Sequence, residues 1–202
     1  MKASELFLQI EQLITPQMDG WCIPEKACDF AAFILSLRPK VSVEIGVWGG
    51  RGTLSMALAH RFIDFGHVVA IDPWSASASI VGQTGKDLDY WSNQEMHDLV
   101  YGRFMKNLAI LQLHNWVEVQ RKRSDEATLP DVIDFAVLDG NHAEQAIADV
   151  DRVGKRVPVG GVVYLDDLKW TGGAVGRAAE NLVKMGFRKL YGRDQGAFFQ
   201  RV

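Results

Sequence analysis

Three aspartates follow two apolar runs of the sequence, at points where a strand is expected to end. Asp139 closes IDFAVLD, and Asp166 and Asp167 close GGVVYLDD. Because the carboxyl ends of parallel strands meet at one edge of a sheet, we expect these carboxylates to converge. Converging carboxylates repel one another unless a proton or a cation lies between them, and their oxygen atoms suit a hard ion such as Mg²⁺. The alternative is that one or more of them only caps the helix that follows.

A histidine stands close to the first of these aspartates. His142 follows Asp139 by three residues. An imidazole titrates near neutral pH and can accept a proton from a hydroxyl group, which a metal-bound hydroxyl releases more readily. We therefore interpret His142 as a candidate general base. Without a metal ligand beside it, the same histidine would be interpreted as a turn residue before a helix.

A second group of candidate residues lies in VEIGVWGGRGTLSMALAH, residues 43–60. An apolar run, a glycine-rich turn and a helical pattern follow one another, an arrangement that binds the polar end of a nucleotide-like cofactor. A dinucleotide fingerprint would need glycine where Trp48 stands, and the Gly-Lys-Ser/Thr of a P-loop is absent. Glu44 and Asp72 close the first and second apolar runs, and an acid at the second position can bind both hydroxyls of a ribose. Alternatively, both acids only cap neighbouring turns.

The elements that must position these residues alternate along the chain. Apolar runs predict strands at VSVEI, HVVAI, WVEV, IDFAVL, GGVVYLD, FRKLY and AFFQRV, and helical periods lie between them at 53–61, 93–112, 143–153 and 174–185. This alternation predicts a doubly wound α/β fold with a mostly parallel seven-stranded sheet. The intervening GRDQG predicts that the last two strands form an antiparallel hairpin. Two further helices are expected within residues 1–38.

The length and composition fit one soluble domain over residues 1–202. The chain has 202 residues, a hydrophobic fraction of 48% and a formal net charge of -3, which argues against a nucleic-acid-binding protein. No apolar run reaches the length of a membrane span or forms a secretory leader, so we expect a cytoplasmic protein without a membrane partner. Cys22 and Cys28 fit neither a redox pair nor a zinc site and are interpreted as packing residues. The sequence leaves open whether the protein forms a homo-oligomer.

Residues 73–92 lack a sustained period and follow the second strand, at the sheet edge where ligands of open α/β folds bind. We predict a lid loop, the alternative being a mobile surface insertion. Four aromatic residues in expected loops could pack a sugar or ring substrate, or could fill the rim of the core. The other histidines are interpreted as structural. The four aromatic residues are Trp74, Tyr90, Trp91 and Trp170.

The pattern E-x-G-x-x-x-G at 44–50, Asp72 and the run at 134–167 together resemble class I S-adenosylmethionine-dependent methyltransferases. Within that class, the chain is most similar to the metal-dependent O-methyltransferase branch, and GWCIPEKA and DGNH are more like its macrocin-type members, which tailor small molecules. This branch includes catechol O-methyltransferase, macrocin O-methyltransferase and the related cephalosporin hydroxylase group. The resemblance covers about residues 20–202 and implies the Rossmann-like methyltransferase fold.

The resemblance also implies ligands and roles. The expected cofactors are S-adenosylmethionine and Mg²⁺ or another hard divalent cation, with Asp139, Asp166 and Asp167 as metal ligands and His142 as the base. Gly52 stands where relatives often have a serine that binds the cofactor carboxylate, and Thr53 is the candidate replacement. The implied cofactor contacts are Glu44, Gly46, Trp48 and Gly50 for the methionine part, Asp72 for the ribose, and Ser124 and Asp125 for the adenine.

The expected reaction is therefore methyl transfer to a hydroxyl of a small molecule. Sugar-bearing natural products are favoured as acceptors by the family likeness alone. One alternative is a hydroxylase-like or nicotinamide-dependent enzyme, although Trp48 argues against the nicotinamide fingerprint. The other is a non-catalytic module that binds S-adenosylmethionine.

Overall fold

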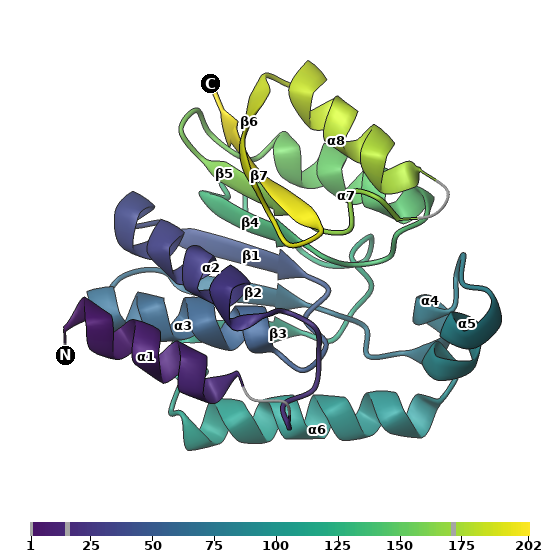
Figure 1. Ribbon diagram of the computed structural model, residues 1–202, viewed down its shortest axis with the longest axis horizontal. Helices are drawn as coiled ribbons and strands as arrows, with labels where there is room; N and C mark the ends of the chain where they lie inside the picture. The colour runs from purple at the N-terminus through teal and green to yellow at the C-terminus, as the bar shows by residue number, and fades with distance from the viewer. Residues whose placement is uncertain (1, 15–16, 171–172) are drawn as a thin grey trace.

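The structure is a computed structural model that describes residues 2–14, 17–170 and 173–202. Its strands form one sheet in the order β3-β2-β1-β4-β5-β7-β6 (Figure 1). Strands β1 to β5 are parallel, whereas β7 runs antiparallel to both β5 and β6. The predicted sheet and its C-terminal hairpin are confirmed. The strands are β1 Val41–Ile45, β2 His67–Ile71, β3 Val117–Gln120, β4 Phe135–Leu138, β5 Val162–Leu165, β6 Phe187–Arg193 and β7 Gly196–Arg201.

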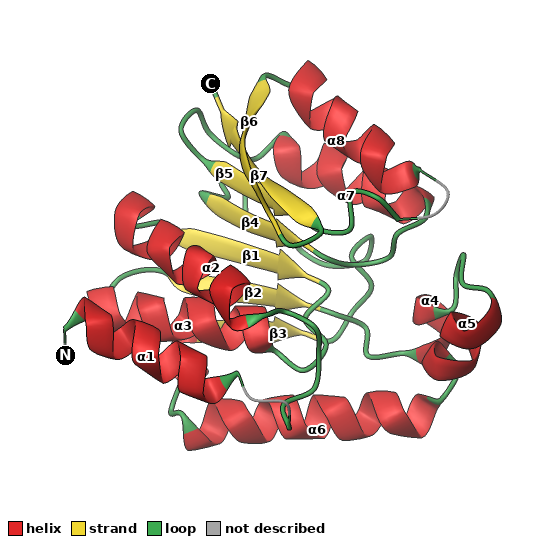
Figure 2. Ribbon diagram, in the orientation of Figure 1, coloured by secondary structure: helices red, strands yellow, loops and turns green. Residues whose placement is uncertain are grey.

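Helices cover both faces of this sheet (Figure 2). Helices α1 Ala3–Leu13, α2 Pro24–Leu37, α3 Arg51–Ile63 and α6 Gln94–Ile110 pack on one face, and α7 Glu144–Gly154 and α8 Ala174–Lys184 pack on the other. Every residue of β4 and β5 is buried, because strands covered on both faces are apolar on both sides. The helices expected at 53–61, 93–112, 143–153 and 174–185, and the two expected before the first strand, are confirmed with small shifts at their ends.

The segment 73–92 differs from the expected loop because it contains two short helices, α4 Ala76–Ser79 and α5 Gly85–Trp91. Neither helix has a buried residue, so no apolar stripe in the sequence announces them. They lie beyond the carboxyl ends of the strands, apart from the helical layers (Figure 1). A lid role for this segment stays a prediction.

The remaining element is a short turn of 3-10 helix, η1 His114–Trp116, before β3. Among the described residues, no helix combines the length and the apolar character that crossing a bilayer requires. Helix α1 buries Leu6 and Ile10 in the same core cluster as Phe135 of β4 and Val162 of β5. The N-terminal helices thus share a core with the sheet.

Candidate functional site

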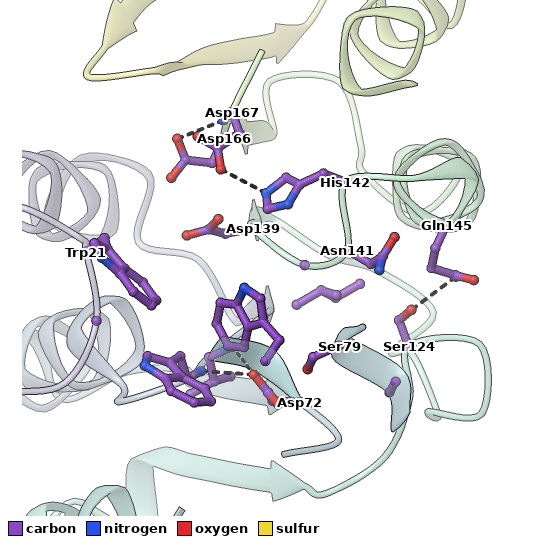
Figure 3. A pocket seen from close by; sticks show the side chains of 18 of the residues that line it. Trp21, Asp72, Ser79, Ser124, Asp139, Asn141, His142, Gln145, Asp166 and Asp167 are labelled. Carbon is purple, nitrogen blue, oxygen red and sulfur yellow. Dashed lines mark hydrogen bonds and ion pairs between the residues drawn. The ribbon is translucent and has the colours of Figure 1, made fainter. Parts of the chain in front are cut away.

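A cavity of about 1000 Å³ opens at the carboxyl ends of the strands (Figure 3). It lies between the β1–α3 turn, the segment after β2, and the loops that follow β4 and β5. This volume suits a ligand of cofactor size. Two predicted site residues, Gly50 and Thr53, do not line it. The predicted site residues that do line it are Glu44, Gly46, Trp48, Asp72, Ser124, Asp125, Asp139, His142, Asp166 and Asp167.

The glycines of the β1–α3 turn are required largely by contacts within the protein. Gly46 has a φ of +88°, and a Cβ at this position would collide with the Asp139 carbonyl at the end of β4. Gly50 has a φ of +86°, and a Cβ there would collide with the Phe104 ring of α6. Packing against α6 is thus one reason for a glycine at this position, and the contact of Gly50 with the cofactor stays a prediction.

Glu44, at the end of β1, is 4% exposed and accepts a hydrogen bond from the Thr53 hydroxyl. A Cβ on Gly52 would collide with Glu44 Oε1, so the carboxyl group occupies the place of a side chain at residue 52. Thr53 therefore contacts Glu44, and its role as the replacement for a cofactor-binding serine stays a prediction. Burial raises the pKa of Glu44 to about 8, despite the opposing hydrogen bonds from Thr53. The carboxyl group is protonated at neutral pH unless a cationic group binds beside it.

Asp72, at the end of β2, fastens the glycine-rich turn. Its Oδ2 accepts the backbone amides of Val47 and Trp48 at 2.9 Å each, and its Oδ1 accepts the amide of Trp74 at 2.7 Å. Burial raises the pKa of Asp72, and these backbone hydrogen bonds oppose that rise. The capping role is thus present in the structure. A carboxylate has about four lone-pair sites, so Asp72 keeps an acceptor for a ligand in the cavity.

A polar group from α7 lines another side of the cavity. Gln145 Nε2 donates to Ser124 Oγ at 3.1 Å and to Asp149 Oδ1 at 2.9 Å (Figure 3). Asp125 is paired with Arg123 at 3.0 Å on the surface. Asp149, 3% exposed, was not predicted from the sequence. Its spacing of four residues from Gln145 on one helix face could have indicated it.

The acidic end of the cavity joins Asp139, His142 and Asp167, whose ligand atoms all lie within 4.8 Å of one another. His142 Nε2 is 2.8 Å from Asp167 Oδ2 (Figure 3). This histidine lowers the pKa of Asp167, whereas burial and the neighbouring Asp166 raise the pKa of Asp139. The His142 ring also stacks on Trp170, with centroids 4.5 Å apart.

Asp166, the third predicted metal ligand, does not belong to this group. Its Oδ2 forms an ion pair with Lys26 of α2, and its Oδ1 accepts the Tyr164 hydroxyl at 3.0 Å and the Asp167 amide at 2.9 Å. The structure therefore groups His142, in place of Asp166, with the other two aspartates. Lys26 lines the cavity and was not predicted from the sequence, because 140 positions separate it from its partner.

Aromatic side chains form a wall of the cavity. Trp48 lies 4.8 Å from Trp91, and Trp21 lies 5.7 Å from Trp91 and 5.9 Å from Tyr90, as distances between ring centroids. Trp74, in contrast, is 0% exposed and stacks on a phenylalanine of α6. Of the two alternatives open for Trp74, substrate packing or filling the core, the structure supports the second.

The other histidines and the two cysteines lie outside the acidic group. His60 and His97 are buried and hydrogen-bonded to Phe65 and Trp91 backbone carbonyls, in line with structural roles. Burial lowers the pKa of His60 to about 4, so this ring stays neutral. Both cysteines are free, and Cys22 lines the cavity.

The sequence of this chain also matches a known protein family. A family model described as a methyltransferase domain matches residues 43–168. The chain belongs to this methyltransferase family. The match includes every residue predicted from the resemblance as a cofactor or metal contact, whereas Lys26 lies outside it. The predicted methyltransferase identity is confirmed.

Solved structures share the fold at low sequence identity. The O-methyltransferase NovP matches with a TM-score of 0.69 and 18% identity, over 88% of this chain and 78% of NovP. A putative caffeoyl-CoA O-methyltransferase from Staphylococcus aureus matches with 0.63 and 16%, over 98% and 91% of the two chains. TomG from Streptomyces achromogenes, an O-methyltransferase solved with S-adenosylmethionine, matches with 0.60 and 14%, over 100% and 91%. No curated protein matches the sequence.

Proposed function

We propose that this methyltransferase transfers the methyl group of S-adenosylmethionine to a hydroxyl of a small molecule. The proposal rests on the observation that one cavity contains two groups of candidate residues. The β1–α3 turn with Glu44 and Asp72 lies on one side, and Asp139, His142 and Asp167 lie on the other. The S-adenosylmethionine complex of TomG and the O-methyltransferase names of the similar structures support the same reaction.

The donor fits the first side of the cavity. Asp72 has a free acceptor for the ribose hydroxyls, and Glu44 supplies a buried carboxyl group for the amino group of the methionine part. Ser124 and Asp125, together with the buried Asp149, offer polar atoms to the adenine. Trp48, in the β1–α3 turn, also lines the cavity.

A divalent cation fits the second side. Donor atoms within 4.8 Å of one another match the spacing of ligands around one hard ion, and carboxylate oxygens are the ligands that Mg²⁺ prefers. Asp139 and Asp167 would hold the ion, and His142 borders it. When bound, such an ion lowers the pKa of a hydroxyl group that contacts it.

His142 is placed to accept the proton of the acceptor hydroxyl. Its Nε2 lies 2.8 Å from Asp167 Oδ2, and both ring nitrogens are buried without a hydrogen bond of good geometry among the described residues. A neutral imidazole keeps one nitrogen lone pair for a proton, and Trp170 stacks on the ring.

The acceptor is a small molecule with a ring beside its hydroxyl group. The wall of Trp21, Trp48, Tyr90 and Trp91 supports this choice, because aromatic faces pack against planar rings and against the apolar faces of sugars. A sugar-bearing natural product is consistent with this wall. The presence of His142 beside two carboxylates favours an enzyme over a module that only binds S-adenosylmethionine.

Calorimetry with the demethylated donor, S-adenosylhomocysteine, tests the proposal. We expect S-adenosylhomocysteine to bind and NAD not to bind, and we expect methyl transfer to a panel of phenols and glycosides to release S-adenosylhomocysteine. Tighter binding of NAD would overturn the proposed function.

A further inference from the structure

We propose that Lys26 is an internal counter-cation that holds Asp166 out of the divalent-cation site and leaves Asp139 and Asp167 as its carboxylate ligands. This inference rests on the proposed function, because it concerns the cation site of that function. It makes the N-terminal helix α2 a determinant of cation affinity.

The first observation behind this inference is the buried position of Lys26 in the cavity wall. Lys26 is 3% exposed and projects from the first turn of α2 into the cavity wall. Its Nζ forms an ion pair with Asp166 Oδ2 and lies 3.5 Å from Asp194 Oδ2, in the β6–β7 hairpin. A buried ammonium group must have such partners, because an unpaired charge is expensive to remove from water. The pair is therefore a fixed part of this wall.

The second step is that the negative charge of Asp166 is already engaged by the Lys26 ammonium. This carboxylate is 5% exposed and receives three donors, the Lys26 ammonium, the Tyr164 hydroxyl and the Asp167 amide. They occupy both oxygens and about three of the four lone-pair sites of a carboxylate. Asp139 presents the contrast, because its carboxylate accepts no hydrogen bond from the described residues. Of these two acids, only the half-buried Asp139 is available to an incoming ion.

The third step concerns charge. Four acids, Asp139, Asp166, Asp167 and Asp194, line one end of the cavity, and the Lys26 ammonium pairs with Asp166 and Asp194. A divalent cation then meets the two remaining carboxylates, those of Asp139 and Asp167. Without Lys26, the same ion would meet three carboxylates, one of them freed of its strongest donor. Since the number of charged ligands tunes the affinity of a hard-ion site, Lys26 keeps that affinity low.

Binding of Mn²⁺, measured by electron paramagnetic resonance of the free ion, tests this role without an activity assay. We expect Lys26→Gln to bind Mn²⁺ about tenfold or more tightly than the wild type, the range over which partners of metal ligands act. Lys26→Arg keeps the positive charge and should stay close to the wild type. Arg38→Gln is the matched control, because it removes one positive charge from the exposed end of the same helix.

Variants of Asp166, the ion-pair partner of Lys26, distinguish this proposal from the alternative in which Asp166 is already a metal ligand. Asp166→Asn alone leaves the buried Lys26 ammonium without its closest carboxylate, so it should weaken Mn²⁺ binding by repulsion. The double variant Lys26→Gln/Asp166→Asn removes the buried pair together and should bind Mn²⁺ within about twofold of the wild type, since Asp139 and Asp167 remain as ligands. If the double variant binds much more weakly than the wild type, or if Lys26→Gln leaves binding unchanged or weaker, the proposal is wrong.

S-adenosylhomocysteine binding, measured on the same samples, keeps the two proposals apart. Mn²⁺ binding by Lys26→Gln when the wild type binds none would support the role of Lys26. The absence of Mn²⁺ binding from both proteins would overturn it, while S-adenosylhomocysteine binding with methyl transfer would leave the proposed reaction standing. Loss of S-adenosylhomocysteine binding from the wild type would instead overturn the proposed function.

Discussion

Single residues around the cavity serve the fold and the proposed chemistry together. Asp72 holds the amides of the glycine-rich turn and also borders the space for a ribose. We expect Asp72→Ala to weaken S-adenosylhomocysteine binding by ~1–3 kcal/mol, the cost of leaving hydrogen-bonding groups without a charged partner. Calorimetry measures the loss, with Asp89→Ala, an exposed acid of α5, as the control. Unchanged affinity in Asp72→Ala would remove this residue from the site.

Glu44 makes donor binding sensitive to pH. Because burial raises its pKa to about 8, the carboxyl group is protonated at pH 7 in the free protein. A cationic amino group bound beside it would lower that pKa, so binding should release up to about one proton and tighten as the pH rises toward 8. Calorimetry in buffers of different ionisation enthalpy measures the release, which should disappear in Glu44→Gln. The same release from both proteins would assign the proton to another group.

His142 and Asp139 are close in sequence but have different proposed roles. His142→Ala should keep cation and S-adenosylhomocysteine binding and lose ~10²- to 10⁴-fold in turnover, the usual contribution of a general base. Asp139→Asn should weaken cation binding, so its activity should recover in part when Mg²⁺ is raised. His114→Ala, an exposed histidine before β3, is the control. Rescue of His142→Ala by Mg²⁺ would place the histidine among the metal ligands.

At the scale of elements, the middle of the α4–α5 segment has few contacts with the rest of the protein. The buried Trp74 fixes its start, Tyr90 and Trp91 at its end pack on Trp21 and Trp48, and Asn141 donates to the Val81 carbonyl at 2.8 Å. Since neither short helix has a buried residue, we expect rapid opening. We expect hydrogen exchange of residues 73–92 to be fast in the free protein and slower with donor and acceptor bound. Asn141→Ala should speed exchange of the free protein, and equal exchange with and without ligands would contradict a lid.

The strands and long helices could be predicted because their apolar patterns repeat over many residues. The runs VSVEI and HVVAI are buried strands, and the period over 93–112 becomes α6. Helices α4 and α5 could not be predicted, because four and seven residues without a buried face carry no period. The two alternatives for Trp74 stayed open for a related reason, since a tryptophan after a strand does not reveal whether its ring turns inward.

The site itself was only partly predictable. Asp139, His142 and Asp167 follow strands whose ends the sheet brings to one edge, so their convergence could be expected from order along the chain. The engagement of Asp166 by Lys26 depends on how α2 packs across the sheet, which no local pattern specifies. The contact of Gly52 with Glu44 is similar, because it depends on the direction of a buried side chain.

At the scale of the whole molecule, helix α2 and the C-terminal hairpin meet beside the cavity. Arg193 Nε of the C-terminal hairpin lies 2.5 Å from Asp29 Oδ2 of α2, close to the pairing of Lys26 with Asp194. Helix α1 contributes Leu6 to the core cluster that also contains residues of β4 and β5. The N-terminal helices and the hairpin are therefore expected to unfold with the sheet as one cooperative unit.

Urea unfolding of variants in α1 tests whether the protein unfolds as one cooperative unit. Far-ultraviolet circular dichroism and tryptophan fluorescence should report the same midpoint, as expected of a two-state domain. Leu6→Ala should lower the free energy of unfolding by ~2–5 kcal/mol, because it removes a fully buried side chain from the shared core. Leu8→Ala is the matched control, since Leu8 is 53% exposed on the same helix and should change stability little. If Leu6→Ala instead produced an early transition confined to part of the helical signal, α1 would be a separate unit, and the single domain over residues 1–202 would be wrong.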